Sequence, residues 1–209
     1  METNTALRRW ELALLLGAAA AALLGVWLNG AQAALADSVI RLHVIANSDS
    51  EEDQALKLMV RDRILEEAEA LCDPEGGLEE AYDILQANLD RLSAAGQEVV
   101  EAQGYDYPVR AALEESWFPT KEYTDFALPA GNYIALKVTI GEGSGQNWWC
   151  VVFPPLCLGS VTEQVEETAL AGGLTEGEVS LITGENEGYV VKFKAMELWE
   201  ELKAALAGE

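Results

Sequence analysis

The chain has 209 residues, of which 13 are basic and 36 are acidic, so its formal net charge at pH 7 is −23. A surface this negative repels nucleic-acid phosphates and anionic lipid headgroups, which excludes nucleic-acid binding as a function. About 170 residues follow an apolar leader, and that length suffices for one domain with a single hydrophobic core.

The leader occupies the start of the chain. Residues 12–28 are all apolar or small, Arg8-Arg9 precedes them, and Ala31-Gln32-Ala33 follows. A basic start, a short apolar core and an A-x-A triplet are typical of a secretory signal peptide, cleaved after this triplet or after Ala36. Because the apolar run is near the shortest length that spans a bilayer, an uncleaved membrane anchor is the alternative. Both interpretations place the chain from Ala34 onward outside the cytoplasm, since the arginines stay inside.

The first folded elements expected after the leader are a strand and a capped helix. Residues 39–46 alternate, and every second side chain from Ile40 to Ala46 is apolar, which indicates a half-buried strand. In the polar turn that follows, both Ser48 and Ser50 stand three residues before an acidic residue, a pattern typical of a helix N-terminus. Apolar residues then recur at three- and four-residue steps, which predicts a helix that ends before residues 73–77.

The rest of the chain changes from helical to strand-like patterns. A second amphipathic helix is predicted over residues 78–103, antiparallel to the first because the linker is short. Residues 161–170 read as a weak acidic helix or a disordered segment. Residues 133–140 and 148–153 are expected to pair as a hairpin across a glycine-rich loop. The predicted strands are 107–115, 122–126, 133–140, 148–153 and 187–194, and a helix over 196–206 closes the chain.

These elements predict an α+β fold in the order β-α-α-β-β-β-β-β-α. A largely antiparallel sheet is expected to be packed by an N-terminal antiparallel helix pair and a C-terminal helix. The predicted organisation is a signal peptide or membrane anchor over residues 1–36 and a single extracytoplasmic domain over residues 37–209.

The sequence offers few residues for catalysis or metal binding. His43 is the one histidine, no G-x-S-x-G motif supplies a nucleophilic serine, and scattered cysteines do not make a zinc set. In residues 47–53 an amide or acidic side chain occurs at every second position, as in a calcium-binding loop. The sixth position holds Glu52 and the twelfth holds Leu58, however, which excludes an EF-hand. No catalytic residue, cofactor site or metal site is therefore predicted.

Cysteines 150 and 157 are candidates for a disulfide. They flank Pro154-Pro155, which can turn the chain so that the two sulfur atoms approach, and an exported protein favours oxidation. The alternative is that Cys150 and Cys157 are two buried thiols. The remaining cysteine, Cys72, follows the first predicted helix and is interpreted as a small core residue.

Two adjacent tryptophans mark a further candidate site. Neighbouring side chains of a strand face opposite sides, so one of Trp148 and Trp149 is expected in the core and the other at the surface. An exposed tryptophan beside residues 153–156 would form a contact patch. The alternative is that helices cover both rings.

Three blocks of the chain resemble the stage II sporulation protein R family. They are IRLHVIANSDSEEDQALKLMVRDR at residues 40–63, WWCVVFPPLC at 148–157, and VKFK with ELWEEL at 191–194 and 197–202. The blocks occur in the family's order and are spread over most of the exported part.

The resemblance implies an exported signalling protein. Members of that family are made in the forespore, exported into the space between the two membranes, and sensed by a membrane-embedded aspartic protease of the mother cell. That protease cleaves a pro-sigma factor, so the chain would be an activator rather than an enzyme, with the membrane contacted only through the leader. The alternatives are an exported carboxylate-dependent hydrolase or an envelope-binding module.

The candidate receptor contacts lie in two stretches of the sequence. The turn after the first strand holds more charged and amide side chains than helix capping needs, and for that reason we expect it to contribute to the receptor surface. The candidates are His43, Asn47, Asp49, Trp148, Trp149 and Phe153.

Overall fold

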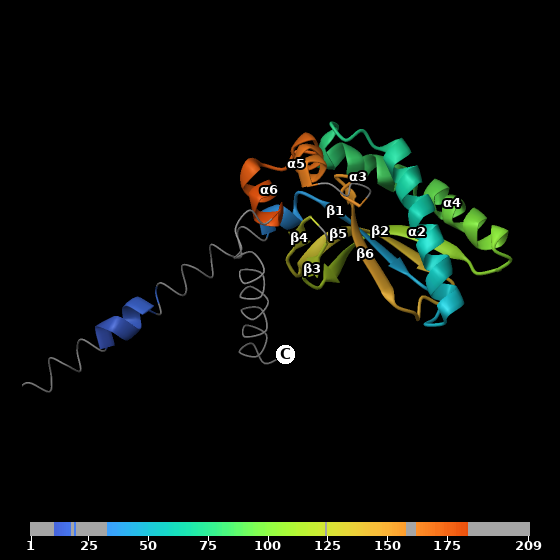
Figure 1. Ribbon diagram of the computed structural model, residues 1–209, viewed down its shortest axis with the longest axis horizontal. Coiled ribbons are helices and arrows are strands. Elements are labelled where there is room, and N and C mark those ends of the chain that lie inside the picture. The colour runs from blue at the N-terminus through green and yellow to red at the C-terminus, as the bar shows by residue number, and fades with distance from the viewer. Residues whose placement is uncertain (1–10, 18, 20–32, 124, 158–161, 184–209) are drawn as a thin grey trace, which may run out of the picture.

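The computed structural model describes residues 11–17, 19, 33–123, 125–157 and 162–183 (Figure 1). It confirms the predicted α+β class, with a mostly antiparallel four-stranded sheet. In chain order the elements are β1 (Ile40–Ile45), α2 (Glu51–Leu71), α3 (Gly77–Ala87), α4 (Leu89–Ala102), β2 (Val109–Phe118), β3 (Lys121–Glu122), β4 (Ala127–Leu128), β5 (Gly131–Ile140), β6 (Asn147–Phe153), α5 (Thr162–Ala171) and α6 (Glu176–Thr183).

The order of strands in the main sheet is β2-β5-β1-β6. The predicted hairpin between residues 133–140 and 148–153 is therefore wrong, because β1 lies between β5 and β6. β1 pairs with β5 in parallel and with β6 in antiparallel orientation, whereas β2 and β5 are antiparallel. The first strand of the chain is thus central to the sheet, and β6 is at an edge.

The glycine-rich loop after β5 crosses the end of β1 instead of closing a hairpin. In this loop the Gly145 N–H donates to the Ala46 carbonyl at 3.0 Å, and the Ser144 N–H donates to the Asn47 carbonyl at 3.2 Å. Gly141 has φ +58°, and a Cβ there would collide with the Asn47 side chain. The glycines therefore serve a close approach between loop and turn, which the sequence pattern alone does not distinguish from a hairpin loop.

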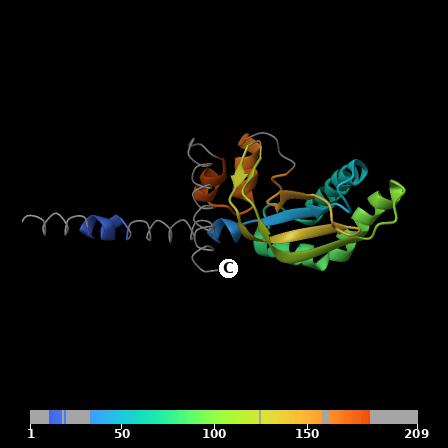
Figure 2. The same cartoon turned by 90° about the horizontal axis from the view of Figure 1, so that it is seen from below.

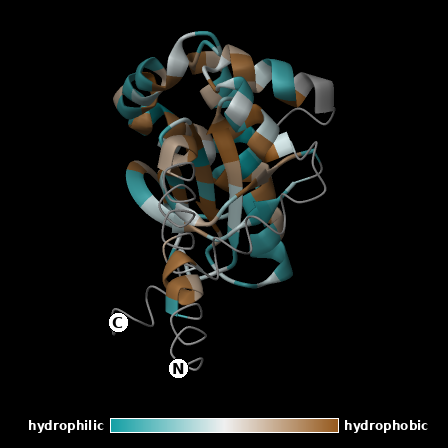
Figure 3. Cartoon of the chain, turned by 90° about the vertical axis from the view of Figure 1, so that its left-hand side faces the viewer, coloured by the Kyte–Doolittle hydropathy of each residue, from teal (hydrophilic) through white to brown (hydrophobic). Residues whose placement is uncertain are grey.

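One face of the sheet packs against the helices. Ile40, Leu42 and Val44 are fully buried there, as the alternation of residues 39–46 predicts. They meet the apolar faces of α2 and α4, and each side chain of this size contributes roughly 1.5–3 kcal/mol to stability when fully buried. Figure 3 shows the same division, with brown strands at the centre of the molecule and many teal residues on the helices.

Side-chain hydrogen bonds to the backbone mark the start of α2 and the end of α3. Ser50 is the N-cap of α2, since its hydroxyl accepts from the Asp53 N–H at 3.1 Å. The predicted helix over residues 78–103 is two helices, α3 and α4, separated at Asn88. The Asn88 side-chain amide donates to the Ile84 carbonyl at 2.7 Å, so this residue closes α3.

A second core lies on the opposite side of the sheet, near the start of β1. Figure 2 shows the β3–β4 pair, α5 and α6 together at that end. Leu35 and Val39 are fully buried in this core with Phe118 and residues of α5 and α6. Because Leu35 belongs to the core, the folded domain begins before residue 37.

Several predicted elements have a different outcome. The predicted strand 122–126 is wrong, because β3 ends at Glu122 and β4 begins only at Ala127; each of these strands has two residues, and α6 was not predicted. The segment predicted at 161–170 corresponds to the helix α5, which begins at Thr162. The predicted strand 187–194, the helix 196–206 and most of the leader lie outside the described residues. Within the described ranges, no helix combines the length and the apolar character that a membrane crossing requires.

Candidate functional site

The candidate residues fall into two regions at β1 and its neighbours. One is the turn from Asn47 to Asp53, which connects β1 to α2. The other, here called the open face, is the part of the sheet surface away from α2 and α4 that the second core leaves uncovered. Strand register places these side chains on it: Arg110, Ala112 and Glu114 of β2, Lys137 and Thr139 of β5, His43 and Ile45 of β1, and Asn147 and Trp149 of β6.

The polar groups of the turn bind to one another and to neighbouring loops. The Asn47 amide donates to Asp53 Oδ2 at 2.9 Å, and its Oδ1 accepts from the Glu142 N–H at 3.0 Å. The Ser48 hydroxyl donates to the same Asp53 oxygen at 2.5 Å. Four residues of this turn, Asp49, Ser50, Glu51 and Glu52, are exposed. The turn is therefore held together from within, and Asn47 connects β1, α2 and the loop after β5.

The Asp53 carboxylate is the centre of this network and is 4 % exposed. Burial opposes its ionisation, but hydrogen bonds from Ser48, Asn47 and Tyr107 outweigh burial and lower the pKa of Asp53 below its ordinary value. The carboxylate is thus ionised at neutral pH and accepts from three side chains.

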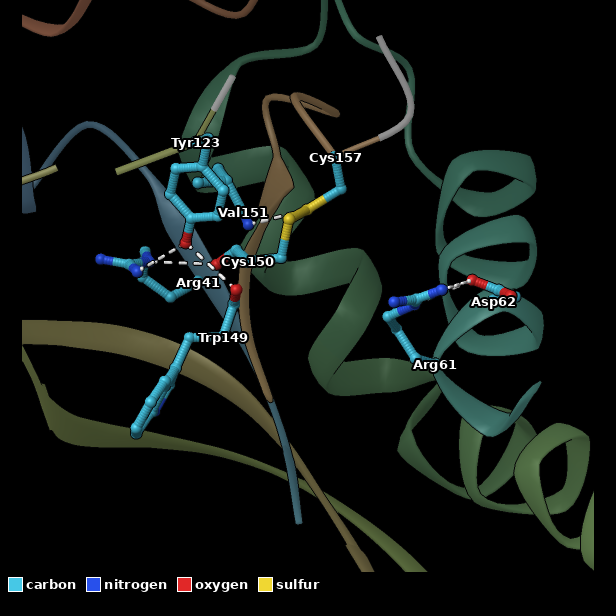
Figure 4. Close-up of a disulfide and its surroundings, with 8 residues drawn as sticks. All are labelled: Arg41, Arg61, Asp62, Tyr123, Trp149, Cys150, Val151 and Cys157. Carbon is cyan, nitrogen blue, oxygen red and sulfur yellow. Dashed lines mark hydrogen bonds and ion pairs between the residues drawn. A yellow bond between two sulfur atoms is a disulfide. The ribbon is translucent and has the colours of Figure 1, made fainter. Parts of the chain in front are cut away.

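Arg41 lies beneath the cover formed by the β3–β4 pair and is fully buried. Its Nε donates to the Cys150 carbonyl and its Nη2 donates to the Tyr123 hydroxyl, each at 3.0 Å (Figure 4). The guanidinium carbon is 4.3 Å from the centre of the Phe118 ring and 4.9 Å from that of Tyr133. These groups are all neutral, so the charge of Arg41 is met by aromatic rings, a carbonyl and a phenol.

His43 and Trp149 lie beside each other on the open face. Their rings are stacked with centroids 6.0 Å apart, and Lys121 Nζ lies 4.5 Å from the centre of the Trp149 ring. The His43 Nε2–H donates to Asn147 Oδ1 at 2.8 Å. Burial lowers the pKa of His43 below 6.5, so the ring is neutral at pH 7.

Three buried nitrogen atoms of this region have no hydrogen-bond partner among the described residues. They are Arg41 Nη1, His43 Nδ1 and Trp149 Nε1. All three belong to neighbouring strands and to the same face of the sheet. Native structures leave few buried polar groups unsatisfied, so a cluster of three is an unusual feature that calls for an explanation.

The two tryptophans face opposite sides of the sheet, as expected for adjacent residues of a strand, but neither is in the core. Trp148 is 37 % exposed and lies over Arg61 of α2, with 4.4 Å between the guanidinium carbon and the ring centre. Trp149 is half-buried and packs against the second core. The expectation of one outward ring and one ring in the core therefore holds only in part, because Trp149 contacts a core without being fully buried in it. Phe153 is 1 % exposed and packs in the core, so it is not available as a surface contact.

Cys150 and Cys157 are joined by a disulfide in the structure, with Cα atoms 6.0 Å apart (Figure 4). This bond ties the end of β6 to the segment after Pro154-Pro155. The third cysteine, Cys72, is a half-buried C-cap of α2 rather than a full core residue, and burial raises the pKa of its thiol to about 11.

Sequence reasoning missed three residues of this region. The sequence assigns no role to Arg41, Lys121 or Tyr123. Arg41 is a basic residue in a strand whose other face is wholly apolar, and this pattern is the signal that could have identified it. Lys121 and Tyr123 reach the site only through the β3–β4 pair, which no periodicity predicts.

The described residues contain no group of three or more His, Cys, Asp or Glu side chains arranged to hold a metal ion. The charged and hydrogen-bonding side chains of the two regions are therefore described by their contacts with one another, at the turn and on the open face.

The comparisons with known proteins identify the family. The family model of stage II sporulation protein R matches residues 36–163. A protein named stage II sporulation protein R from Bacillus subtilis (strain 168) is 35 % identical over 156 residues, which is 72 % of this chain and 70 % of that relative. The chain belongs to the stage II sporulation protein R family. No solved structure shows significant similarity to it.

The match to the stage II sporulation protein R family covers both candidate regions. Residues 36–163 include β1, the turn, the β3–β4 pair, β6 and both cysteines of the disulfide. They do not include α6, which packs against the start of the domain through the second core.

Proposed function

We propose that this protein is an exported signal of sporulation that activates a membrane-embedded aspartic protease, which then cleaves a mother-cell pro-sigma factor. The observation that carries this proposal is membership of the stage II sporulation protein R family, whose model spans the sheet and the turn. The chemistry of the site supports a binding role: His43 donates to an asparagine and stacks on a tryptophan, an arrangement suited to contact rather than to proton transfer.

The experiment that tests this function is a deletion in a spore-forming bacterium, followed by immunoblotting of the pro-sigma factor. We expect cleavage to stop in the deletion strain and to resume when the intact chain is expressed in the forespore. Normal cleavage in the deletion strain would contradict the proposal and favour a hydrolase or an envelope-binding module. Expression of the chain only in the mother cell is the control, since the proposal requires export from the forespore.

We further propose that the domain lies in the space between forespore and mother cell, and that any cleavage of the leader falls after Ala33 rather than after Ala36. Leu35 is fully buried among residues of the second core, and the Ser38 hydroxyl donates to the Ala34 carbonyl at 2.8 Å. Cleavage after Ala36 would remove both contacts. A reporter fused after Ser38 should be active only outside the cytoplasm, and N-terminal sequencing of exported protein should not begin at Asp37.

A further inference from the structure

We propose that the open face, together with Lys121, docks a carboxylate-bearing segment of a partner protein. This inference rests on the proposed function, because it assigns the partner's chemistry at the surface that carries His43 and Trp149. Three features of the molecule support it: the sign of the charge on this face, the buried arginine beneath it, and the unsatisfied nitrogen atoms.

The charge of the open face is opposite to that of the molecule. The chain carries −23 overall, yet Arg110 and Lys137 lie on this face and Lys121 lies over its Trp149 ring. Glu114 binds Lys137 at 2.9 Å and compensates one of these charges. An acidic segment is attracted here and repelled from most of the remaining surface, which would fix both the place and the orientation of docking.

Arg41 adds a positive charge beneath this face, and the side-chain and backbone groups that it contacts in the described chain are neutral. It is fully buried, its Nε and Nη2 donate to a carbonyl and a phenol, and its Nη1 has no hydrogen-bond partner in the described chain. A buried cation next to neutral groups is costly unless something else stabilises it. A carboxylate beside the β3–β4 cover would supply that stabilisation, and the cover is attached by a pair of strands of only two residues each.

The unsatisfied atoms next to Arg41 have the chemistry that a peptide carboxylate needs. Trp149 Nε1–H is a buried donor with no acceptor among the described residues, and the half-buried ring offers an apolar surface to the stem of an aspartate or glutamate. Carboxylate hydrogen bonds to charged and indole donors are directional, so they would select an acidic side chain over an apolar one. Ile45, on the strand next to Trp149, supplies apolar area on the same face.

The experiment uses the full-length chain in detergent, labelled with 5-fluorotryptophan, whose six fluorine signals are assigned by single Trp→Phe variants. The probe is an acetylated and amidated hexaglutamate peptide, and hexaglutamine is the uncharged control. We expect hexaglutamate to shift the Trp149 signal saturably and to leave Trp148 unchanged, because Trp148 faces Arg61 on the other side of the sheet. The shift should weaken when salt is raised from 0.05 M to 0.5 M.

A matched pair of charge reversals locates the effect. Lys121 and Arg61 each place a cation over one of the two adjacent tryptophans, at 4.5 and 4.4 Å from the ring centre. Lys121→Glu should weaken hexaglutamate binding about tenfold or more, and Arg61→Glu should leave it unchanged. Equal effects of both reversals, an equal response to hexaglutamine, or no shift of Trp149 at millimolar peptide would overturn the proposal.

One further variant distinguishes the partner from the chain itself. Reversal of Glu200 and Glu201 to lysine in the full chain should not alter the Trp149 signal if the occupant is another protein. A change in that signal without added peptide would assign the open face to the chain's own C-terminal segment and overturn the proposal. Pro-sigma cleavage is scored separately, so normal activation by Lys121→Glu would refute acidic docking while leaving the activator function intact.

Discussion

The turn after β1 and the open face are both rich in polar groups, and they lie next to each other on the same strand, but they use those groups in opposite ways. In the turn, Asn47, Ser48 and Asp53 bind one another and the loop after β5. On and beneath the open face, three buried nitrogen atoms lack a partner in the described chain. Polar composition alone therefore does not separate a turn whose polar groups are satisfied within the fold from a face with unsatisfied groups, which is where we propose that the partner docks.

The largest expected effect belongs to the turn. Asp53→Ala should lower the free energy of unfolding by about 2–4 kcal/mol, because the Asn47 amide and the Ser48 hydroxyl would lose a buried charged acceptor. Urea unfolding measures this loss. Pro-sigma cleavage per amount of folded, exported protein should remain normal. Loss of cleavage at normal stability would show that the turn itself contacts the receptor and would remove the contrast between the two regions.

The disulfide is expected to have the next largest effect. Replacement of both Cys150 and Cys157 by alanine should lower the free energy of unfolding by about 2–3 kcal/mol, through the greater entropy of the unfolded chain. Mass spectrometry of the exported wild type without reductant should show the loss of two hydrogens in the peptide that holds both cysteines. Reductant should destabilise the wild type and leave the double variant unchanged; two free thiols in folded, exported protein would contradict the prediction.

The sequence predicted individual elements better than their arrangement. The alternation in residues 39–46 located β1 and its buried face correctly, since burial follows local periodicity. It did not show that β1 is inserted between β5 and β6, because pairing depends on contacts between distant segments. The loop after β5 contains the glycines of a hairpin, but Gly141 and Gly145 are needed where the loop passes over Asn47 and Ser48.

The candidate site was predicted only in part, again because contacts between distant segments do not show in local sequence patterns. His43 and Trp149 were singled out from residue type and strand alternation, and the structure places them side by side. Arg41 was not, because a basic residue on a half-buried strand is ordinarily expected to face water. Its burial depends on the β3–β4 pair and on Phe118, which lie more than seventy residues further along the chain.

A pH series separates the two regions further. Burial lowers the pKa of His43, so as the pH falls below 6.5 the unfolded state binds a proton before the folded state does. Stability should therefore decline from pH 6.5 downward, by less than about 1.4 kcal/mol per pH unit for this one group. Asp53 affects stability at lower pH. Its lowered pKa contributes stability above about pH 4, and this contribution is lost as the pH falls through the pKa that Asp53 has in the folded state.

The control for this series is a pair of single variants. His43→Gln should flatten the part of the stability profile just below pH 6.5, and Asp53→Asn should flatten the part below about pH 4. The measurement is the free energy of urea unfolding at each pH. An unchanged slope near pH 6 in His43→Gln would show that another group titrates there.

The smallest expected effect on stability, and the sharpest test of the comparison, comes from an exposed residue of the turn. Asp49→Lys should change the free energy of unfolding by no more than about 0.5 kcal/mol, because its side chain is exposed. If the turn only builds the fold, pro-sigma cleavage should also be normal. His43→Ala, on the open face, should reduce cleavage although the chain remains folded, since it removes a ring that stacks on Trp149. Thermal unfolding and immunoblotting of the same exported samples decide between them. Loss of cleavage in Asp49→Lys with normal cleavage in His43→Ala would move the receptor contact from the open face to the turn.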